Sequence, residues 1–406
     1  MSSRFALPPL LAAFLSGRTA SASSGVDART AATPGAARPG FLRFPGTGGG
    51  WVLLDARNPA VFRAGTALLP RGRFVTRIAS RVVRASSHVG LHARLARGRV
   101  EGANLSSAGL HARFPALPAD LACNAASGVP GRDQKTIVQL VTRAGRVVAF
   151  AKLADAPHAR ALVRHEARVL ELLAARGVAA PGALGLEDDA DATVLVQSAL
   201  HGERAPGRFG PAHAAFLADL AARTRVELPA DEHPGRRVAH ERLEALAARA
   251  DRDWLEAYAA LHRSLAPRSA DERVPGSLAH GDFTPWNAVV GADGLRAFDW
   301  EHALLTAPLG HDALHFVLQQ AILVERVPHA MLRAHVLARL APHAELIAPR
   351  AFDRALGAYL LELGLSDELR QLEQRSPFAQ VDWLRDARLA LVTDQLRRGA
   401  PRERAA

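Results

Sequence analysis

Residues 280–287 have the composition and spacing of a catalytic loop. They read His-Gly-Asp-Phe-Thr-Pro-Trp-Asn, and an acidic segment, Asp-Trp-Glu, follows at residues 299–301. Between the two segments lie two short apolar runs, separated by the turn Gly-Ala-Asp-Gly at residues 291–294. An Asp-Gly turn between apolar runs is typical of a β-hairpin. The sequence therefore predicts a hairpin with polar residues at its base.

The predicted hairpin brings Asn287 and Asp299 together. Asn287 precedes the first strand and Asp299 follows the second, and antiparallel pairing places those two ends side by side. An amide oxygen and a carboxylate at one point suit a hard cation such as Mg²⁺. Asp282, on the preceding loop, is then free to accept a proton from an attacking hydroxyl. An ordinary loop before a hairpin is the alternative interpretation.

Lysine is rare in this chain, which has two, Lys135 and Lys152, beside 49 arginines. Lys152 closes the apolar run 147–152, which predicts the end of a strand. A compact ammonium binds phosphate as a point charge, which a planar guanidinium does not do. We therefore expect Lys152 to bind nucleotide phosphates. Chance retention under an arginine-rich composition is the alternative, and for Lys135 the two interpretations stand equally.

A helix is predicted over residues 157–176, because apolar residues recur there with the helical period: Leu162, Val169, Leu170 and Leu173. Glu166 lies in the middle of this apolar stripe, whereas Glu171 points to the opposite side. A carboxylate that faces a core is costly unless it is paired. Lys152, on the neighbouring strand, is the predicted partner of Glu166.

The spacing His-x-Asp-x4-Asn, with a later Asp beyond a hairpin, matches a kinase catalytic loop. The motif His-Gly-Asp-x-x-Pro-x-Asn, followed by Phe-Asp-Trp-Glu, resembles that of the aminoglycoside phosphotransferase and choline kinase superfamily. The resemblance covers about residues 120–395. This resemblance implies an α+β, bilobal protein-kinase-like fold, with a small β-rich N-lobe and a mostly helical C-lobe. It also implies ATP and Mg²⁺ as cofactors.

The resemblance assigns roles to residues on both predicted lobes. Asp282 would be the catalytic base, with His280 supporting its loop through hydrogen bonds. Asn287 and Asp299 would be metal ligands. Lys152 would bind the nucleotide phosphates, with Glu166 as its ion-pair partner. Asp312 resembles the aspartate that braces the catalytic loop, and a surface salt bridge is its alternative.

Two further nucleotide contacts are implied by the resemblance alone. Ser127, Gly128 and Gly131 correspond to a phosphate-binding loop, although Pro130 departs from the family pattern and leaves open which N–H groups face the phosphates. The segment from Gln197 to Ala199 corresponds to the hinge that hydrogen-bonds adenine. A plain strand end is the alternative for that segment.

Four parts are expected along the chain. Residues 1–40, rich in Ala, Ser, Gly and Pro, are expected to be disordered. Residues 41–115 form an unassigned accessory region, 116–200 the nucleotide-binding N-lobe, and 201–406 the helical catalytic and substrate C-lobe. Periodic apolar stripes predict helices in that last part at residues 212–223, 241–265, 311–324 and 381–396.

The accessory region contains an amphipathic pattern. Apolar and arginine residues alternate there with helical spacing: Val75, Ile78, Val82 and Val83 among Arg77, Arg81 and Arg84. Such a helix is able to touch an anionic partner. A helix with a solvated arginine face is the alternative.

Composition narrows the functional class. The net charge of +11 is spread along the chain with few aromatics among the arginines, so nucleic acid is not the expected partner. No apolar run approaches the length of a membrane span. Cys123 is alone, which suits a reducing cytoplasm. The apolar segment 5–15 resembles a signal peptide, but Pro8 and Pro9 interrupt it, and a site that uses ATP favours the cytoplasm.

These features predict an ATP-dependent phosphotransferase that moves the γ-phosphoryl group to a hydroxyl of a small molecule. The superfamily uses aminoglycosides, choline-like amines, amino-acid alcohols and sugars, and the sequence leaves the acceptor and the oligomeric state open. His311 and His315, four residues apart, have metal-ligand spacing but no third ligand, so we expect a structural role. The alternative function is a catalytically silent nucleotide-binding regulator, or a scaffold with a basic N-terminal interaction region.

Overall fold

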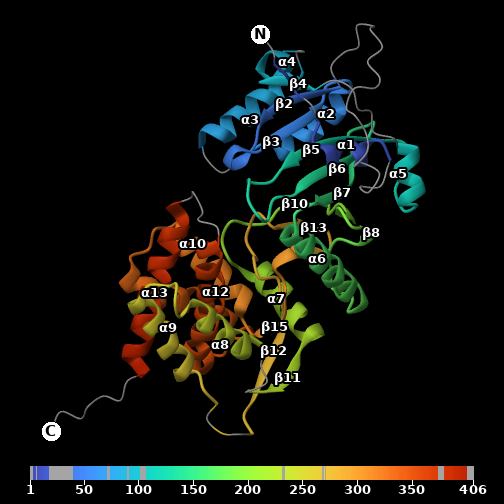
Figure 1. Ribbon diagram of the computed structural model, residues 1–406. Helices are drawn as coiled ribbons and strands as arrows, with labels where there is room; N and C mark the ends of the chain where they lie inside the picture. The colour runs from blue at the N-terminus through green and yellow to red at the C-terminus, as the bar shows by residue number, and fades with distance from the viewer. Residues whose placement is uncertain are drawn as a thin grey trace, which may run out of the picture. The chain divides into compact units, whose positions relative to one another are not determined.

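The structure is a computed structural model that describes residues 3–5, 7–17, 40–70, 74–88, 91–100, 107–230, 234–267, 269, 271–373 and 379–399. The chain divides into two compact units. Unit 1 comprises Met1–Glu171 and Pro181–Ala199, and unit 2 comprises Leu172–Ala180 and Leu200–Ala406. Figure 1 labels most of the elements of both units.

Unit 1 is built on one nine-stranded sheet in the order β1-β4-β2-β3-β5-β6-β7-β9-β8. Its strands are β1 (Ser3–Phe5), β2 (Phe41–Pro45), β3 (Trp51–Asp55), β4 (Gly98–Val100), β5 (Leu121–Ser127), β6 (Thr136–Thr142), β7 (Val147–Ala154), β8 (Ala183–Asp188) and β9 (Thr193–Ser198). Its helices are α1 (Pro9–Leu15), α2 (Pro59–Gly65), α3 (Phe74–Ser86), α4 (His92–Leu95), α5 (Ser107–Arg113) and most of α6 (Pro157–Ala175). The strand predicted over residues 147–152 and the helix predicted over residues 157–176 are therefore present.

The region before residue 116 extends the same sheet. Val52 of β3 pairs with Ala126 of β5 in antiparallel register. The hydroxyl of Ser127 also accepts a hydrogen bond of 2.9 Å from the main-chain N–H of Trp51. Because β3 pairs with β5, the accessory strands and the strands of the predicted N-lobe share one hydrogen-bonded sheet.

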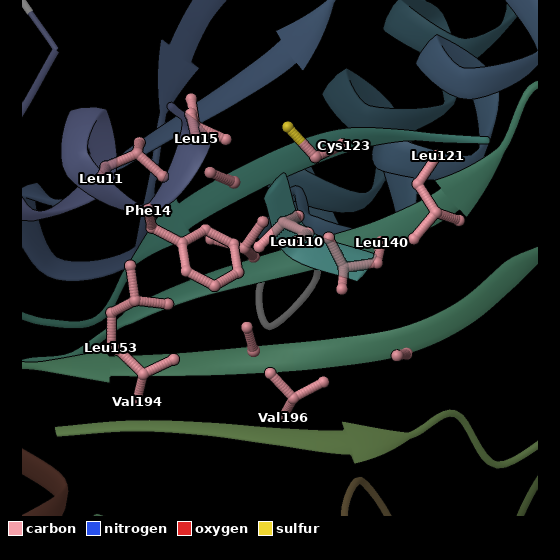
Figure 2. Close-up of a cluster of buried hydrophobic side chains, with 14 of the residues drawn as sticks. Leu11, Phe14, Leu15, Leu110, Leu121, Cys123, Leu140, Leu153, Val194 and Val196 are labelled. Atoms are coloured by element: carbon pink, nitrogen blue, oxygen red, sulfur yellow. The ribbon is translucent and has the colours of Figure 1, made fainter. Parts of the chain in front are cut away.

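Helix α1 packs into the hydrophobic core of unit 1. Leu11, Phe14 and Leu15 are each 1% exposed, and they lie against side chains of the sheet such as Leu153 and Val194 (Figure 2). The expectation of disorder for residues 1–40 is therefore wrong for this helix, because its apolar face is buried. Residues 18–39 lie outside the described part of the chain.

Helix α3 only partly follows the predicted amphipathic pattern. Val83 is buried beside Phe44 and Phe62, whereas Ile78 and Val82 are 44% and 48% exposed. The apolar stripe is thus divided between the core and the solvent. The side chains of Val75 and Arg77 lie outside the described residues.

Unit 2 is mostly helical and carries two three-stranded sheets. Its helices are α7 (Pro211–Thr224), α8 (Pro234–Leu246), α9 (Arg252–Ser264), α10 (His311–Leu323), α11 (His329–Leu340), α12 (Phe352–Glu373) and α13 (Ala379–Gly399). One sheet joins β10 (Glu203–Arg204), β13 (Ala288–Gly291) and β14 (Gly294–Ala297). The other joins β11 (Val226–Pro229), β12 (Arg273–Ala279) and β15 (Leu304–Pro308).

The helix predicted over residues 241–265 is wrong as a single element. The chain forms α8 and α9 with a break between them. Asp251 has a non-helical backbone and its side chain caps α9, accepting a hydrogen bond of 3.0 Å from the N–H of Trp254. Trp254 is buried and stacks on Tyr258, so the start of α9 is set by that packing.

Among the described residues, none of the helices has the length and apolar character needed to cross a membrane.

Candidate active site

Unit 1 contains the predicted lysine–glutamate pair. The Nζ of Lys152 donates a hydrogen bond of 2.6 Å to Oε2 of Glu166. The side chains are 6% and 0% exposed, respectively. Glu171 is exposed, as the helical period predicts. In a buried pair, each charge compensates the other, and this contact holds the ammonium in one direction.

The strand that carries Lys152 lies in the middle of the sheet. Lys152 pairs with Ile137 of β6 on one side and with Leu195 of β9 on the other. The predicted position at the end of a strand is therefore wrong, since β7 continues to Ala154. Because strands pair with β7 on both sides, the main chain at Lys152 has little freedom. The side chain that carries the ammonium therefore starts from a fixed position.

The predicted phosphate loop is the turn between β5 and β6. The N–H of Gly128 donates to the carbonyl of Lys135 at 2.8 Å, and the N–H of Gln134 donates to the carbonyl of Gly131 at 3.0 Å. The hydroxyl of Ser127 already accepts from Trp51. The N–H of Gly128 and the Ser127 acceptor are thus engaged within the fold, and the role of this loop in phosphate binding stays a prediction.

The predicted hinge lies where the chain leaves unit 1. Ala199 is the last residue of that unit. Its N–H donates to the carbonyl of Val148 at 3.0 Å, so this donor belongs to the sheet and is not free for adenine. Gln197 is buried, and its Oε1 has no hydrogen-bond partner among the described residues. Adenine recognition at this segment remains a prediction.

The catalytic-loop segment lies in unit 2, and its predicted hairpin is confirmed. Strands β13 and β14 pair from Ala288 opposite Ala297 to Gly291 opposite Gly294. One step beyond the ladder, the N–H of Phe298 donates to the carbonyl of Asn287 at 2.9 Å. Asn287 and Asp299 are consequently neighbours at the base of the hairpin.

Asp299 has a left-handed backbone, with φ 71° and ψ 58°. Few residues other than glycine adopt this conformation, and aspartate is among those that tolerate it. Such strain is maintained by surrounding structure and is concentrated at functional sites. Here it turns the chain sharply after β14, directly beside Asn287.

Asn287 and Asp282 are in direct contact. The Nδ2 of Asn287 donates to Oδ2 of Asp282 at 2.9 Å and to its main-chain carbonyl at 3.0 Å. Both donors of the amide are therefore directed at Asp282, and the amide oxygen is the group left to bind a cation. An amide oxygen beside the carboxylate of Asp299 is a donor set that fits Mg²⁺.

The catalytic loop is braced by Asp312. Its carboxylate accepts hydrogen bonds from the N–H of His280 at 2.7 Å and from the N–H of Gly281 at 3.0 Å. The predicted bracing role of Asp312 is confirmed. Gly281 has φ +81°, and a Cβ there would lie 2.0 Å from the carbonyl oxygen of His302. Only glycine fits at this position.

His280 supports the loop with both of its ring nitrogens. The ring is fully buried, with Nδ1 accepting from the N–H of Asp282 at 3.3 Å. Because Nδ1 is an acceptor, Nε2 carries the proton and donates to the carbonyl of Phe298 at 2.9 Å. This arrangement ties the loop to the end of β14, and it leaves Asp282 as the better placed group for proton transfer.

His315 is a contact of Asp282 that the sequence reasoning assigned only a structural role. Its Nε2 lies 3.3 Å from Oδ1 of Asp282, and its Nδ1 lies 3.3 Å from the hydroxyl of Tyr359. Burial acts to raise the pKa of Asp282, but the hydrogen bond from His315 and the electrostatic interaction with this histidine outweigh it and lower this pKa. Asp282 is therefore ionised at neutral pH.

The signal for His315 in the sequence was its four-residue spacing from His311, which suggested metal binding. The structure shows that His311 is buried beside Tyr359, with an Nδ1 that has no hydrogen-bond partner among the described residues. The ring of His315 also contacts Tyr359, with the ring centroids 6.1 Å apart. The four-residue spacing therefore places both histidines against one tyrosine.

Glu301 belongs to the acidic segment that follows the hairpin. Its side chain is buried, and its Oε1 lies 3.5 Å from Nε2 of His302.

A search of solved structures found similar chains, among them phosphotransferases and a kinase. One is a thermostable mutant of aminoglycoside phosphotransferase APH(4)-Ia in ternary complex with AMP-PNP and hygromycin B, which is 18% identical over 71% of this chain and 97% of that chain, with a TM-score of 0.48. A putative fructosamine-3-kinase from Haemophilus somnus is 14% identical over 66% of this chain and 89% of that chain, with a TM-score of 0.42. A search of curated proteins found no match.

The family comparison is more specific than these likenesses in fold. The model of the phosphotransferase enzyme family matches residues 130–312, a segment that runs from the end of the predicted phosphate loop to Asp312. It includes Lys152, Glu166 and the whole catalytic-loop hairpin. This match agrees with the predicted resemblance to the aminoglycoside phosphotransferase and choline kinase superfamily over residues 130–312.

Proposed function

We propose that this protein transfers the γ-phosphoryl group of ATP to a hydroxyl group of a small molecule. The observation that carries the proposal is the contact between Asn287 and Asp282 at the base of the hairpin. It presents an ionised carboxylate and an amide oxygen in the order and chemistry that phosphoryl transfer requires. The match to the phosphotransferase enzyme family supports the same reaction class.

Each residue has a defined task in this proposal. Asp282 orients the acceptor hydroxyl and takes its proton, since its lowered pKa keeps it ionised. Asn287 and Asp299 would hold Mg²⁺, which when bound neutralises charge on the nucleotide phosphates. Lys152, directed by Glu166, contributes the positive charge that unit 1 offers to those phosphates. Catalysis then consists of positioning and electrostatic stabilisation.

The acceptor belongs to one of the classes used in the superfamily: an aminoglycoside, a choline-like amine, an amino-acid alcohol or a sugar. We place the reaction in the cytoplasm, where ATP is available. The first experiment is a phosphotransfer screen of the purified full chain against a panel of these acceptors with ATP and Mg²⁺. Absence of transfer to every acceptor, with ATP still bound, would favour a silent nucleotide-binding regulator.

The metal assignment has its own test. A fluorescent ATP analogue is titrated with and without Mg²⁺, using the parent and Asp299→Ala. We expect Mg²⁺ to tighten binding to the parent, and this difference to disappear in Asp299→Ala because one of its ligands is lost. Gln395→Ala, far along the chain in α13, is the control and should behave as the parent. Equal dependence on Mg²⁺ in Asp299→Ala and the parent would remove Asp299 from the metal site.

A further inference from the structure

A large cavity lies within unit 2, beside the sheet that leads to the catalytic loop. Its volume is about 920 Å³, and it is lined by residues of the sheet β11-β12-β15, of helices α8 and α12 and of the segment 344–351. Sites for small molecules measure roughly 300 to 1,000 Å³, so this volume is sufficient for an organic ligand. None of the catalytic-loop residues 280–287 lines it.

The walls of the cavity are mainly apolar. They include Leu304 and Leu305 on β15, Leu346 and Ile347 before α12, and Leu361 on α12. Leu305, on the edge strand β15, is 58% exposed. An apolar surface of this extent is favourable to cover, because each CH₂ group removed from water stabilises a complex.

More positively charged than negatively charged side chains line the cavity. Six arginines line it, against three glutamates: Arg225, Arg236, Arg242, Arg273, Arg350 and Arg354, with Glu272, Glu345 and Glu362. Two of the arginines are neutralised on the wall itself. Arg242 pairs with Glu362 at 2.7 Å, and Arg354 pairs with Glu272 at 3.1 Å.

Three other arginines have no carboxylate partner among the described residues. Arg236 donates to the main-chain carbonyl of Leu265 at 3.2 Å, and Arg273 donates to the carbonyl of Glu227. No ion pair of Arg350 occurs in the part of the chain that the structure describes. A main-chain carbonyl satisfies a donor but does not neutralise its charge. The cavity therefore combines apolar walls with an excess of guanidinium groups.

From this combination we infer that the cavity is a binding site for an amphipathic carboxylate, with its hydrocarbon part against the leucines and its head on Arg236, Arg273 or Arg350. A guanidinium binds a carboxylate through two parallel hydrogen bonds, which an ammonium cannot do. A cationic amphiphile of the same length would meet the same walls but the wrong charge. The charge of the head should therefore decide binding.

The arginine-bearing end of this cavity is remote from the catalytic loop. Arg273 starts β12, and His280 follows the end of that strand. At about 3.3 Å per residue, the two are separated by roughly 23 Å along the strand. A carboxylate at Arg273 thus leaves Asp282 unoccupied. The inference does not depend on the proposed phosphotransfer reaction.

Calorimetric titration of the full chain, without nucleotide, tests the inference. The probes are octanoate, decanoate and decyltrimethylammonium, each below the concentration at which it forms micelles. We expect decanoate to bind about tenfold more tightly than octanoate, because two further CH₂ groups are buried. We expect no binding of decyltrimethylammonium. Equal binding of decanoate and decyltrimethylammonium would overturn the inference.

Two neighbouring arginines on α8 provide a matched pair of variants. Arg236→Ala should weaken decanoate binding by about tenfold, since one charged donor to the head is lost. Arg237→Ala is the control, because Arg237 is 74% exposed, lies 4.0 Å from Glu241 and does not line the cavity. If Arg236→Ala does not fold, Arg350→Ala is measured in its place, because Arg350 is exposed and its replacement should not disturb folding. If Arg236→Ala, Arg273→Ala and Arg350→Ala all bind decanoate as the parent does, the cavity does not recognise the carboxylate.

Discussion

Lys152 and Glu166, in unit 1, are carried by a central strand and a long helix, whereas Asp282, Asn287 and Asp299, in unit 2, lie on loops. The first pair is positioned by regular hydrogen bonding and by burial. The second group is positioned by contacts between side chains and the main chain, several of which come from residues far along the sequence.

This difference has a consequence for substitutions. In unit 1, the two side chains are in direct contact, so a change of shape at either residue disturbs the pair directly. In unit 2, the loop has several independent braces: Asp312, His280, Asn287 and the fit at Gly281. A change to the reacting carboxylate alone should then leave the loop in place. Substitutions in the two units test this contrast, and the largest effect is expected at Asp282.

Asp282→Asn should separate chemistry from binding. The amide is nearly the same size but accepts no proton, so we expect kcat to fall by about 10³-fold, within the range of a positioned base. Affinity for ATP and the thermal midpoint should stay close to those of the parent, because the braces of the loop remain. Single-turnover rates, nucleotide titration and thermal unfolding measure the three quantities. A parallel loss of ATP affinity and rate would show that Asp282 holds the nucleotide or its metal.

Acid should destabilise unit 2, because the buried His213 is unfavourable to protonate in the folded chain. His213 contacts the rings of Phe209, Phe316 and Phe283, and burial lowers its pKa from 6.5 to about 4. Between those two pH values the unfolded chain binds a proton that the folded chain does not. The free energy of unfolding is therefore largest above pH 6.5 and should fall by about 3 kcal/mol as the pH decreases to 4.

Tryptophan fluorescence during urea unfolding can follow this loss, since four of the five tryptophans are in unit 2: Trp254, Trp286, Trp300 and Trp383. His213→Gln keeps an acceptor for the N–H of Gly210 but has no proton to gain, so its pH dependence should be shallower. An unchanged slope in His213→Gln would assign the acid sensitivity to other groups.

Lys152→Arg should reduce kcat/KM by about 10²-fold, or about 2.7 kcal/mol of transition-state stabilisation. The guanidinium preserves the charge, but it is too large for a site in which the lysine is 6% exposed, and its fork does not reproduce a single ammonium. Steady-state kinetics with ATP as the varied substrate measures this effect. Full activity of Lys152→Arg would refute the argument that unit 1 depends on the shape of one pair.

His315→Gln should lower kcat by about tenfold without changing KM for ATP. The variant retains a hydrogen-bond donor at the position that contacts Asp282, but loses the link to Tyr359. Tyr359→Phe should have a smaller effect, about threefold, because it acts on Asp282 only through His315. A change in KM for ATP with kcat unaffected would indicate that His315 contributes to nucleotide binding and not to the position of Asp282.

The parts of the site that follow from local patterns were predictable from the sequence. The turn Gly-Ala-Asp-Gly defines the hairpin and hence the meeting of Asn287 with Asp299. The helical period identified Glu166 as a buried carboxylate, and the rarity of lysine identified its partner. The hairpin and the helical period are each readable from one short segment, whereas the lysine stands out only against the composition of the whole chain.

Other parts depend on contacts between distant residues. His315 and Tyr359 are on different helices, and nothing in either segment indicates that both approach Asp282. Helix α1 is a short apolar segment whose burial depends on the sheet that it covers. The break between α8 and α9 was missed because the apolar period continues across it, although Asp251 was a readable capping signal.

The pairing of β3 with β5 also protects the sheet from association. In a chain that began near residue 116, β5 would have an open edge, with unpaired N–H and C=O groups that are able to add a strand from another molecule. The residues that pair there in the intact chain, Val52 and Leu53, would be gone. Such a truncated protein should self-associate as its concentration rises, even though every residue matched to the phosphotransferase enzyme family is retained.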